Sequence, residues 1–125
     1  MRALLLISLG GILGANARYL VTVWAAGRWR ASFPHGTLIA NVSGSFLLGF
    51  FLEAAASGWV SGADARLLIA TGFCGAYTTF STFAFESVAL SRQRDLLPAM
   101  VNVAGSALLG LAAAAAGILV AGALR

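Results

Sequence analysis

The chain has 125 residues, of which 60% are hydrophobic and 10% are charged. Soluble domains are about 25% charged, so this chain has too few polar side chains to cover a water-soluble globule. The composition excludes a disordered chain, and the single cysteine, Cys74, excludes a disulfide scaffold. One cysteine and one histidine argue against a zinc site. We therefore expect residues 1–125 to form one integral membrane domain.

The net charge of +4 comes from eight arginines and four acids, with no lysine. A basic chain can bind nucleic acid when its cations form a stripe or a cluster. Here the arginines are scattered singly or in pairs, and all except Arg18 flank apolar segments. Flanking arginines are typical of membrane spans, so we expect a lipid bilayer and no nucleic acid among the partners.

Four apolar segments are long enough to cross a bilayer, which takes about 20 residues. They are expected at about residues 3–26, 36–56, 65–90 and 96–124. Pro98 falls in the first turn of the last segment, where proline is tolerated. A cleaved signal peptide is disfavoured because the first segment is long and contains Arg18. The predicted fold is an all-α, multi-pass membrane protein of four spans.

The arginines are divided almost evenly between the two sides of the membrane. The side with both termini and the second connection has Arg2, Arg66 and Arg125, and the other side has Arg28, Arg30, Arg92 and Arg94. Because the arginine bias orients membrane proteins, this chain has little preference and could insert both ways up. Two inverted copies would form an antiparallel two-fold dimer. The alternative is that a partner or the insertion machinery orients a weakly biased chain.

Polar side chains recur inside the spans, where polarity is costly. Thr37, Asn41 and Ser45 form one stripe in the second span, and Asn102 and Ser106 form another in the fourth. These stripes have two possible roles: a polar track lined by hydrogen-bond donors, or hydrogen bonds between helices that hold the bundle together.

The third span contains a stretch, residues 72–83, that disfavours a continuous helix. Two glycines are followed by hydroxyl residues, and Thr78 or Thr79 would be a natural N-cap for a restarting helix. A break at membrane depth frees backbone groups that protein, water or an ion must satisfy. The alternative is a kinked helix whose free backbone groups are hydrogen-bonded by threonine hydroxyls.

Two phenylalanines, an arginine and a glutamate in the spans are further candidates for a functional role. Phe80 and Phe83 share a helix face, and ring edges could favour an anion, although lipid contact or packing is the more common role. Arg18 would either reach the interface or raise the local anion concentration in a wet vestibule. Glu86 lies four residues after Thr82, where it could pair with an arginine or cap a helix N-terminus. His35 has no evident role, and no set of catalytic side chains indicates an enzyme.

Three segments resemble the CrcB/Fluc family of fluoride channels, and the resemblance covers nearly the whole chain. They read GGILGANARY at 10–19, GTLIANVSGSF at 36–46 and GFCGAYTTFSTF at 72–83, with Glu86 following. The TTFSTF run is the most specific of these pieces. One departure is Asn102, at a position where many members have tyrosine, so part of the polar track is expected to differ.

The resemblance implies a passive fluoride channel of the cell inner membrane that lowers cytoplasmic fluoride and acts as an antiparallel homodimer. It implies a fluoride pathway formed by Asn41, Phe80, Phe83, Ser81, Thr82, Ser106, Thr37, Arg18 and Glu86. It also implies a structural Na⁺ ion at the dimer interface, held by the backbone carbonyls of Gly75 and Thr78. The main rival is a small multidrug-type proton-coupled exporter, which relies on a glutamate in the first span. This first span has no acid.

Overall fold

The computed structural model describes residues 1–29, 32–60, 62–93 and 96–124, and these are almost entirely helical. The elements are α1 (Arg2–Arg28), α2 (His35–Ala56), α3 (Ala63–Ala65), η1 (Arg66–Cys74), α4 (Gly75–Tyr77), α5 (Phe80–Ser91) and α6 (Leu97–Ala123). Within these ranges there is no strand, and four helical stretches are long and apolar enough to cross a membrane. The prediction of an all-α protein with four membrane-spanning segments is confirmed. Pro98 lies in the first turn of α6, as expected.

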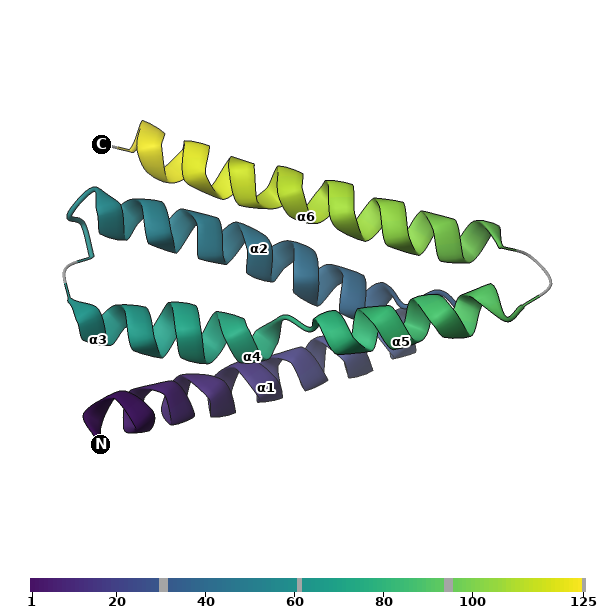
Figure 1. The fold of residues 1–125 in the computed structure, drawn as a ribbon, viewed down its shortest axis with the longest axis horizontal. Coiled ribbons are helices and arrows are strands. Elements are labelled where there is room, and N and C mark those ends of the chain that lie inside the picture. The colour runs from purple at the N-terminus through teal and green to yellow at the C-terminus, as the bar shows by residue number, and fades with distance from the viewer. Residues whose placement is uncertain (30–31, 61, 94–95, 125) are drawn as a thin grey trace.

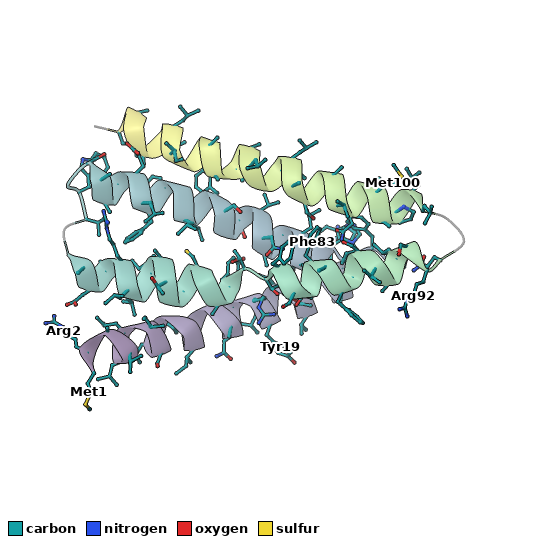
Figure 2. All side chains as sticks on the ribbon, viewed as in Figure 1. Met1, Arg2, Tyr19, Phe83, Arg92 and Met100 are labelled. Atoms are coloured by element: carbon teal, nitrogen blue, oxygen red, sulfur yellow. The ribbon has the colours of Figure 1, made fainter. Side chains whose placement is uncertain are left out.

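Successive spans run in opposite directions, so both chain termini lie at one end of the bundle (Figure 1). Arg2 and Arg92 lie at opposite ends (Figure 2). At the end with the termini, the Arg2 guanidinium forms an exposed ion pair with Asp64. Three of the arginines counted for the two sides, Arg30, Arg94 and Arg125, lie outside the described residues.

Close helix packing depends on glycine at two seams. α6 packs chiefly against α2, and α1 packs chiefly against η1 and also against α2 and α4. At the first seam, a Cβ atom on Gly117 would overlap the carbonyl of Phe46, and at the second, one on Gly14 would overlap the carbonyl of Phe73. Small residues allow membrane helices to approach this closely.

Much of the apolar surface of α1 and α6 is uncovered within one chain. Leu4, Leu13 and Leu20 on α1 and Leu108, Leu111 and Leu119 on α6 are each more than half exposed. Exposed leucines at this density suit a hydrocarbon environment and not water. The protein is a multi-pass membrane protein.

The first half of the third span is a π-helix, η1, which composition did not predict. In a π-helix each N–H donates to the carbonyl five residues earlier, and the Gly75 N–H at its end accordingly donates to the Ala70 carbonyl. Gly72 in this segment lies against the backbone of Ile7 and Gly10 on α1. π-Helical segments are rare and occur frequently at functional sites.

Between α4 and α5 the backbone leaves the helical conformation for two residues. Thr78 has φ −85° and ψ 157°, and Thr79 has φ −151° and ψ 114°, both extended. Thr79 is the N-cap of α5, and its hydroxyl accepts a hydrogen bond from the Thr82 N–H at 3.2 Å. Thr79 is thus one of the two N-cap positions that the sequence predicted. Figure 1 shows the extended link between the two halves of the span.

Candidate functional site

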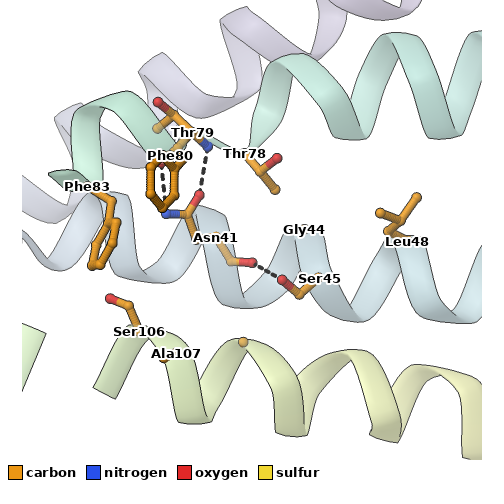
Figure 3. Close-up of a pocket in the computed structure, with 11 residues that line it drawn as sticks. Asn41, Gly44, Ser45, Leu48, Thr78, Thr79, Phe80, Phe83, Ser106 and Ala107 are labelled. Atoms are coloured by element: carbon orange, nitrogen blue, oxygen red, sulfur yellow. Dashed lines mark hydrogen bonds between the residues drawn. The ribbon is translucent and has the colours of Figure 1, made fainter. Parts of the chain in front are cut away.

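A groove of about 360 Å³ runs beside the extended residues, between α2, α5 and α6. It is lined by Asn41, Gly44, Ser45, Leu48, Thr78, Thr79, Phe80, Phe83, Ser106, Ala107 and Gly110. Figure 3 shows these side chains around the groove. The groove therefore brings together four residues of the predicted fluoride pathway: Asn41, Phe80, Phe83 and Ser106.

The Asn41 side chain is tied to the backbone of Thr79 by two hydrogen bonds. The Thr79 N–H donates to Asn41 Oδ1 at 2.7 Å, and Asn41 Nδ2 donates to the Thr79 carbonyl at 3.1 Å (Figure 3). An amide nitrogen carries two N–H groups, so one N–H of Asn41 is left over after this pairing. Since Asn41 lines the groove, the pairing fixes an amide donor at the groove wall.

The interruption releases two backbone carbonyls from the helical ladder. In a continuous helix the N–H groups of Thr79 and Thr82 would donate to the carbonyls of Gly75 and Thr78. Here these two N–H groups donate instead to side-chain oxygens, Asn41 Oδ1 and Thr79 Oγ1. The released carbonyls are those that the family resemblance assigns to sodium.

The described residues contain no group of three or more His, Cys, Asp or Glu side chains that could hold a metal ion. A hard cation such as Na⁺ takes oxygen ligands, and backbone carbonyls are oxygen ligands. Gly75 is exposed within one chain. The carbonyls of Gly75 and Thr78 have the ligand chemistry of a Na⁺ site.

Two phenylalanine rings form one wall of the groove. The ring centroids of Phe80 and Phe83 are 5.7 Å apart with planes tilted by 52°. Phe80 is 80% exposed within one chain, although it lines the groove. Ser106 faces them from α6 (Figure 3). One chain therefore provides two aromatic rings and a serine hydroxyl but leaves the groove open on one side.

A second cleft of about 250 Å³ holds the remaining charged residues of the predicted pathway. Arg18, Thr37, Thr82 and Glu86 line it together with Thr79. The Thr37 hydroxyl donates to Glu86 Oε1 at 2.9 Å, while Glu86 Oε2 is buried with no hydrogen-bond partner in the described part of the chain. The Arg18 Nε donates to the carbonyl of Ala76 at 3.2 Å.

The structure thus divides the predicted pathway residues between two cavities within one chain. Thr37 lines the second cleft and does not join Asn41 in the groove, although the two lie one turn apart on α2. Thr79 lines both cavities, whereas Ser81 is exposed and lines neither. The role of each of these residues in transport stays a prediction.

Asn102 is part of a hydrogen-bonded chain that the sequence did not indicate. It is only 2% exposed, and its Nδ2 donates to the Ser87 hydroxyl on α5 at 2.9 Å. Ser87 in turn donates to the Phe83 carbonyl at 2.8 Å, and Ser106 donates to Asn102 Oδ1 at 3.5 Å. Sequence reasoning missed Ser87, because an isolated serine in a span has no distinguishing pattern.

Comparison with known proteins decides the family. The family model described as "CrcB-like protein, Camphor Resistance (CrcB)" matches residues 5–118. The chain belongs to the CrcB family. The resemblance inferred from the three sequence segments is therefore confirmed.

Three curated relatives illustrate the similarity, each over most of both chains. A protein named "Fluoride-specific ion channel FluC" from a Roseiflexus species is 47% identical over 106 residues, which cover 85% of this chain and 86% of the relative. "Fluoride-specific ion channel FluC 1" from Geobacillus kaustophilus is 48% identical over 115 residues, 89% and 90% of the two chains. The FluC protein of Anaeromyxobacter dehalogenans is 44% identical over 119 residues, 95% and 94% of the two chains. These relatives are named as ion channels and not as enzymes.

Proposed function

We propose that this protein is a passive fluoride channel of the cell inner membrane, built from two inverted copies of the chain. The observation that carries the proposal is the groove in which the Asn41 amide, the Phe80 and Phe83 rings and the Ser106 hydroxyl meet. Relatives about 45% identical that bear the name of fluoride channels support the same function.

The groove has the chemistry that a small anion requires when it leaves water. The remaining N–H of Asn41 and the Ser106 hydroxyl are hydrogen-bond donors that replace water molecules around the ion. The edges of aromatic rings carry partial positive charge, so Phe80 and Phe83 add favourable electrostatics without a fixed cation. A fixed cation at this point would hold the anion too tightly to release it quickly.

Passive conduction needs only the gradient of the ion. Fluoride enters acid-exposed cells as neutral HF and dissociates at the neutral interior pH. A negative-inside membrane potential then drives the anion outward, with about 2.3 kcal/mol per elementary charge per 100 mV. The channel thereby lowers cytoplasmic fluoride.

A second copy in inverted orientation completes the path. The groove is open on one side and Phe80 is largely exposed, so a partner would provide the missing wall. The nearly even distribution of arginines between the two sides permits insertion both ways up. In this arrangement two symmetry-related paths run along the interface.

A structural Na⁺ ion would lie at the dimer interface, held by the carbonyls of Gly75 and Thr78 of both copies. The ion would supply positive charge to balance carbonyl dipoles that the interrupted helix leaves without N–H partners. We expect Arg18, Thr37 and Glu86 to lie toward the ends of the path. All three line one cleft, which supports a shared role.

The test is fluoride efflux from liposomes that contain the purified protein, followed with a fluoride electrode. With a potassium ionophore to carry compensating charge, we expect rapid efflux with no proton gradient. Liposomes without protein report the leak. Efflux that occurs only with an opposing proton gradient would contradict a channel and favour the proton-coupled exporter.

A further inference from the structure

Several hydroxyl groups in the spans bond to their own helix backbone, and Ser106 does not. Ser43, Ser45, Ser87 and Thr78 each donate to the backbone carbonyl four residues earlier, at 2.7–2.9 Å. Such back-bonding occupies the only proton of the hydroxyl. Ser106 donates instead to the side-chain oxygen of the residue four positions earlier, Asn102, at 3.5 Å.

The length of this bond makes it a weak one. Hydroxyl-to-oxygen hydrogen bonds are normally about 2.7–2.8 Å and weaken as they lengthen. The Ser106 proton is therefore held loosely, whereas the Ser45 proton in the same groove is held by the Asn41 carbonyl at 2.7 Å. Turning the hydroxyl toward an anion in the groove therefore breaks a weaker hydrogen bond at Ser106 than at Ser45.

The hydrogen bonds around Asn102 determine which atom of its amide faces each neighbour. The Ser87 hydroxyl donates its one proton to the Phe83 carbonyl, so it can only accept a hydrogen bond from Asn102. The Nδ2 of Asn102 must then face Ser87, and its Oδ1 must face Ser106. Burial at 2% exposure keeps water from competing for either end of the amide.

We propose that Asn102 is a positioning residue that keeps the Ser106 hydroxyl off the backbone and available to donate to fluoride. Asn102 does not line the groove and acts only through Ser106. Without the amide, Ser106 would adopt the bond to the carbonyl four residues earlier that Ser43, Ser45 and Ser87 make, and its proton would be withdrawn from the groove. This inference rests on the proposed function, because the anion in the groove is taken to be fluoride.

The alternative role for a buried asparagine is to join α5 to α6. A double-mutant cycle on fluoride efflux separates the two roles. The variants are Asn102→Leu, Ser106→Ala and the double variant, with Ser91→Ala as the control. Ser91 lies on α5 outside both cavities, and its hydroxyl is bonded to the Val88 carbonyl.

We expect Asn102→Leu and Ser106→Ala each to slow efflux about fivefold, the effect of one lost hydrogen bond. The double variant should be no slower than Ser106→Ala, and Ser91→Ala should match the wild type. Independent, multiplying losses would overturn the inference and assign Asn102 to packing. Wild-type protein that moves no fluoride would overturn the proposed function itself, and this inference with it.

If Asn102→Leu does not fold, Ser87→Ala makes the same test with a smaller change. It removes the acceptor that anchors the Asn102 amide while it leaves the amide in place. We expect a loss of about twofold that disappears in the Ser106→Ala background. An equal loss in both backgrounds would overturn the positioning role.

Discussion

Asn41 on α2 closes the gap in the third span by pairing with both backbone groups of Thr79, at 2.7 and 3.1 Å. This pairing takes the Thr79 N–H out of the helical ladder and supplies a substitute partner at membrane depth, where an unsatisfied group is costly. One side chain thus stabilises the interruption and presents an amide donor to the groove. In the proposed channel, both the stability of the interruption and transport through the groove therefore depend on Asn41.

Replacing Asn41 by aspartate should nearly abolish fluoride efflux. The carboxylate keeps an acceptor for the Thr79 N–H, but it cannot donate to the Thr79 carbonyl, and its negative charge would repel an anion in the groove. We expect at least a hundredfold loss in the liposome assay. Asn16→Ala provides a control, since Asn16 lies on α1, lines neither cavity and donates to the carbonyl of Ile12. Unimpaired efflux through the Asn41→Asp variant would exclude Asn41 from the path.

Replacing Phe80 by isoleucine should also stop efflux while the protein remains folded. The substitution keeps an apolar side chain but removes the ring edge that would face the anion. Phe85→Ile is the matched control, because Phe85 is 74% exposed on the same helix and does not line the groove. Equal effects of the two substitutions on efflux would show that ring edges at Phe80 have no part in conduction.

Removal of sodium should slow efflux reversibly. In the proposed dimer, loss of the ion would leave the carbonyls of Gly75 and Thr78 without a cation and weaken the interface between copies. The measurement is the efflux rate after Na⁺ is replaced by a bulky organic cation on both sides, followed by its return. We expect a saturable recovery with Na⁺ concentration. A rate that does not change with Na⁺ would argue against an ion at this position.

Alanine at Gly117 should destabilise the fold through the α2–α6 seam. The added methyl group would overlap the carbonyl of Phe46, and overpacking of this kind costs about 1–3 kcal/mol. Gly105→Ala on the same helix is the matched control, because nothing lies within 4 Å of its added Cβ. Thermal unfolding in detergent should show a lower midpoint for Gly117→Ala only. Equal midpoints for both variants would mean that the seam tolerates a wider spacing.

The four spans could be predicted because a run of about 20 mostly apolar residues is typical of a transmembrane helix. The interruption near Thr79 could be anticipated as well, from glycines and hydroxyl residues followed by a good N-cap. The π-helical start of the third span could not, since a change from i→i+4 to i→i+5 bonding leaves no pattern in composition. The structure shows this π-helix, for example in the hydrogen bond from the Gly75 N–H to the Ala70 carbonyl.

The sequence indicates which polar and aromatic residues could line a path, but it does not indicate which of them contact one another. Asn41 and Thr79 are 38 positions apart, and only the packing of α2 beside the break brings them together. The same holds for Ser87 and Asn102, which are joined across α5 and α6. The separation of Thr37 from Asn41 also depends on tertiary packing, because both lie on one stripe of the sequence.

The most direct test of fluoride conduction is the reversal potential of the current through the purified protein in a planar bilayer. Opposed gradients of fluoride and chloride make the equilibrium potentials of the two ions opposite in sign. We predict that the current reverses at the fluoride potential and that a pH gradient does not move it. Reversal at the chloride potential, or a reversal potential that follows the pH gradient, would contradict a passive fluoride channel.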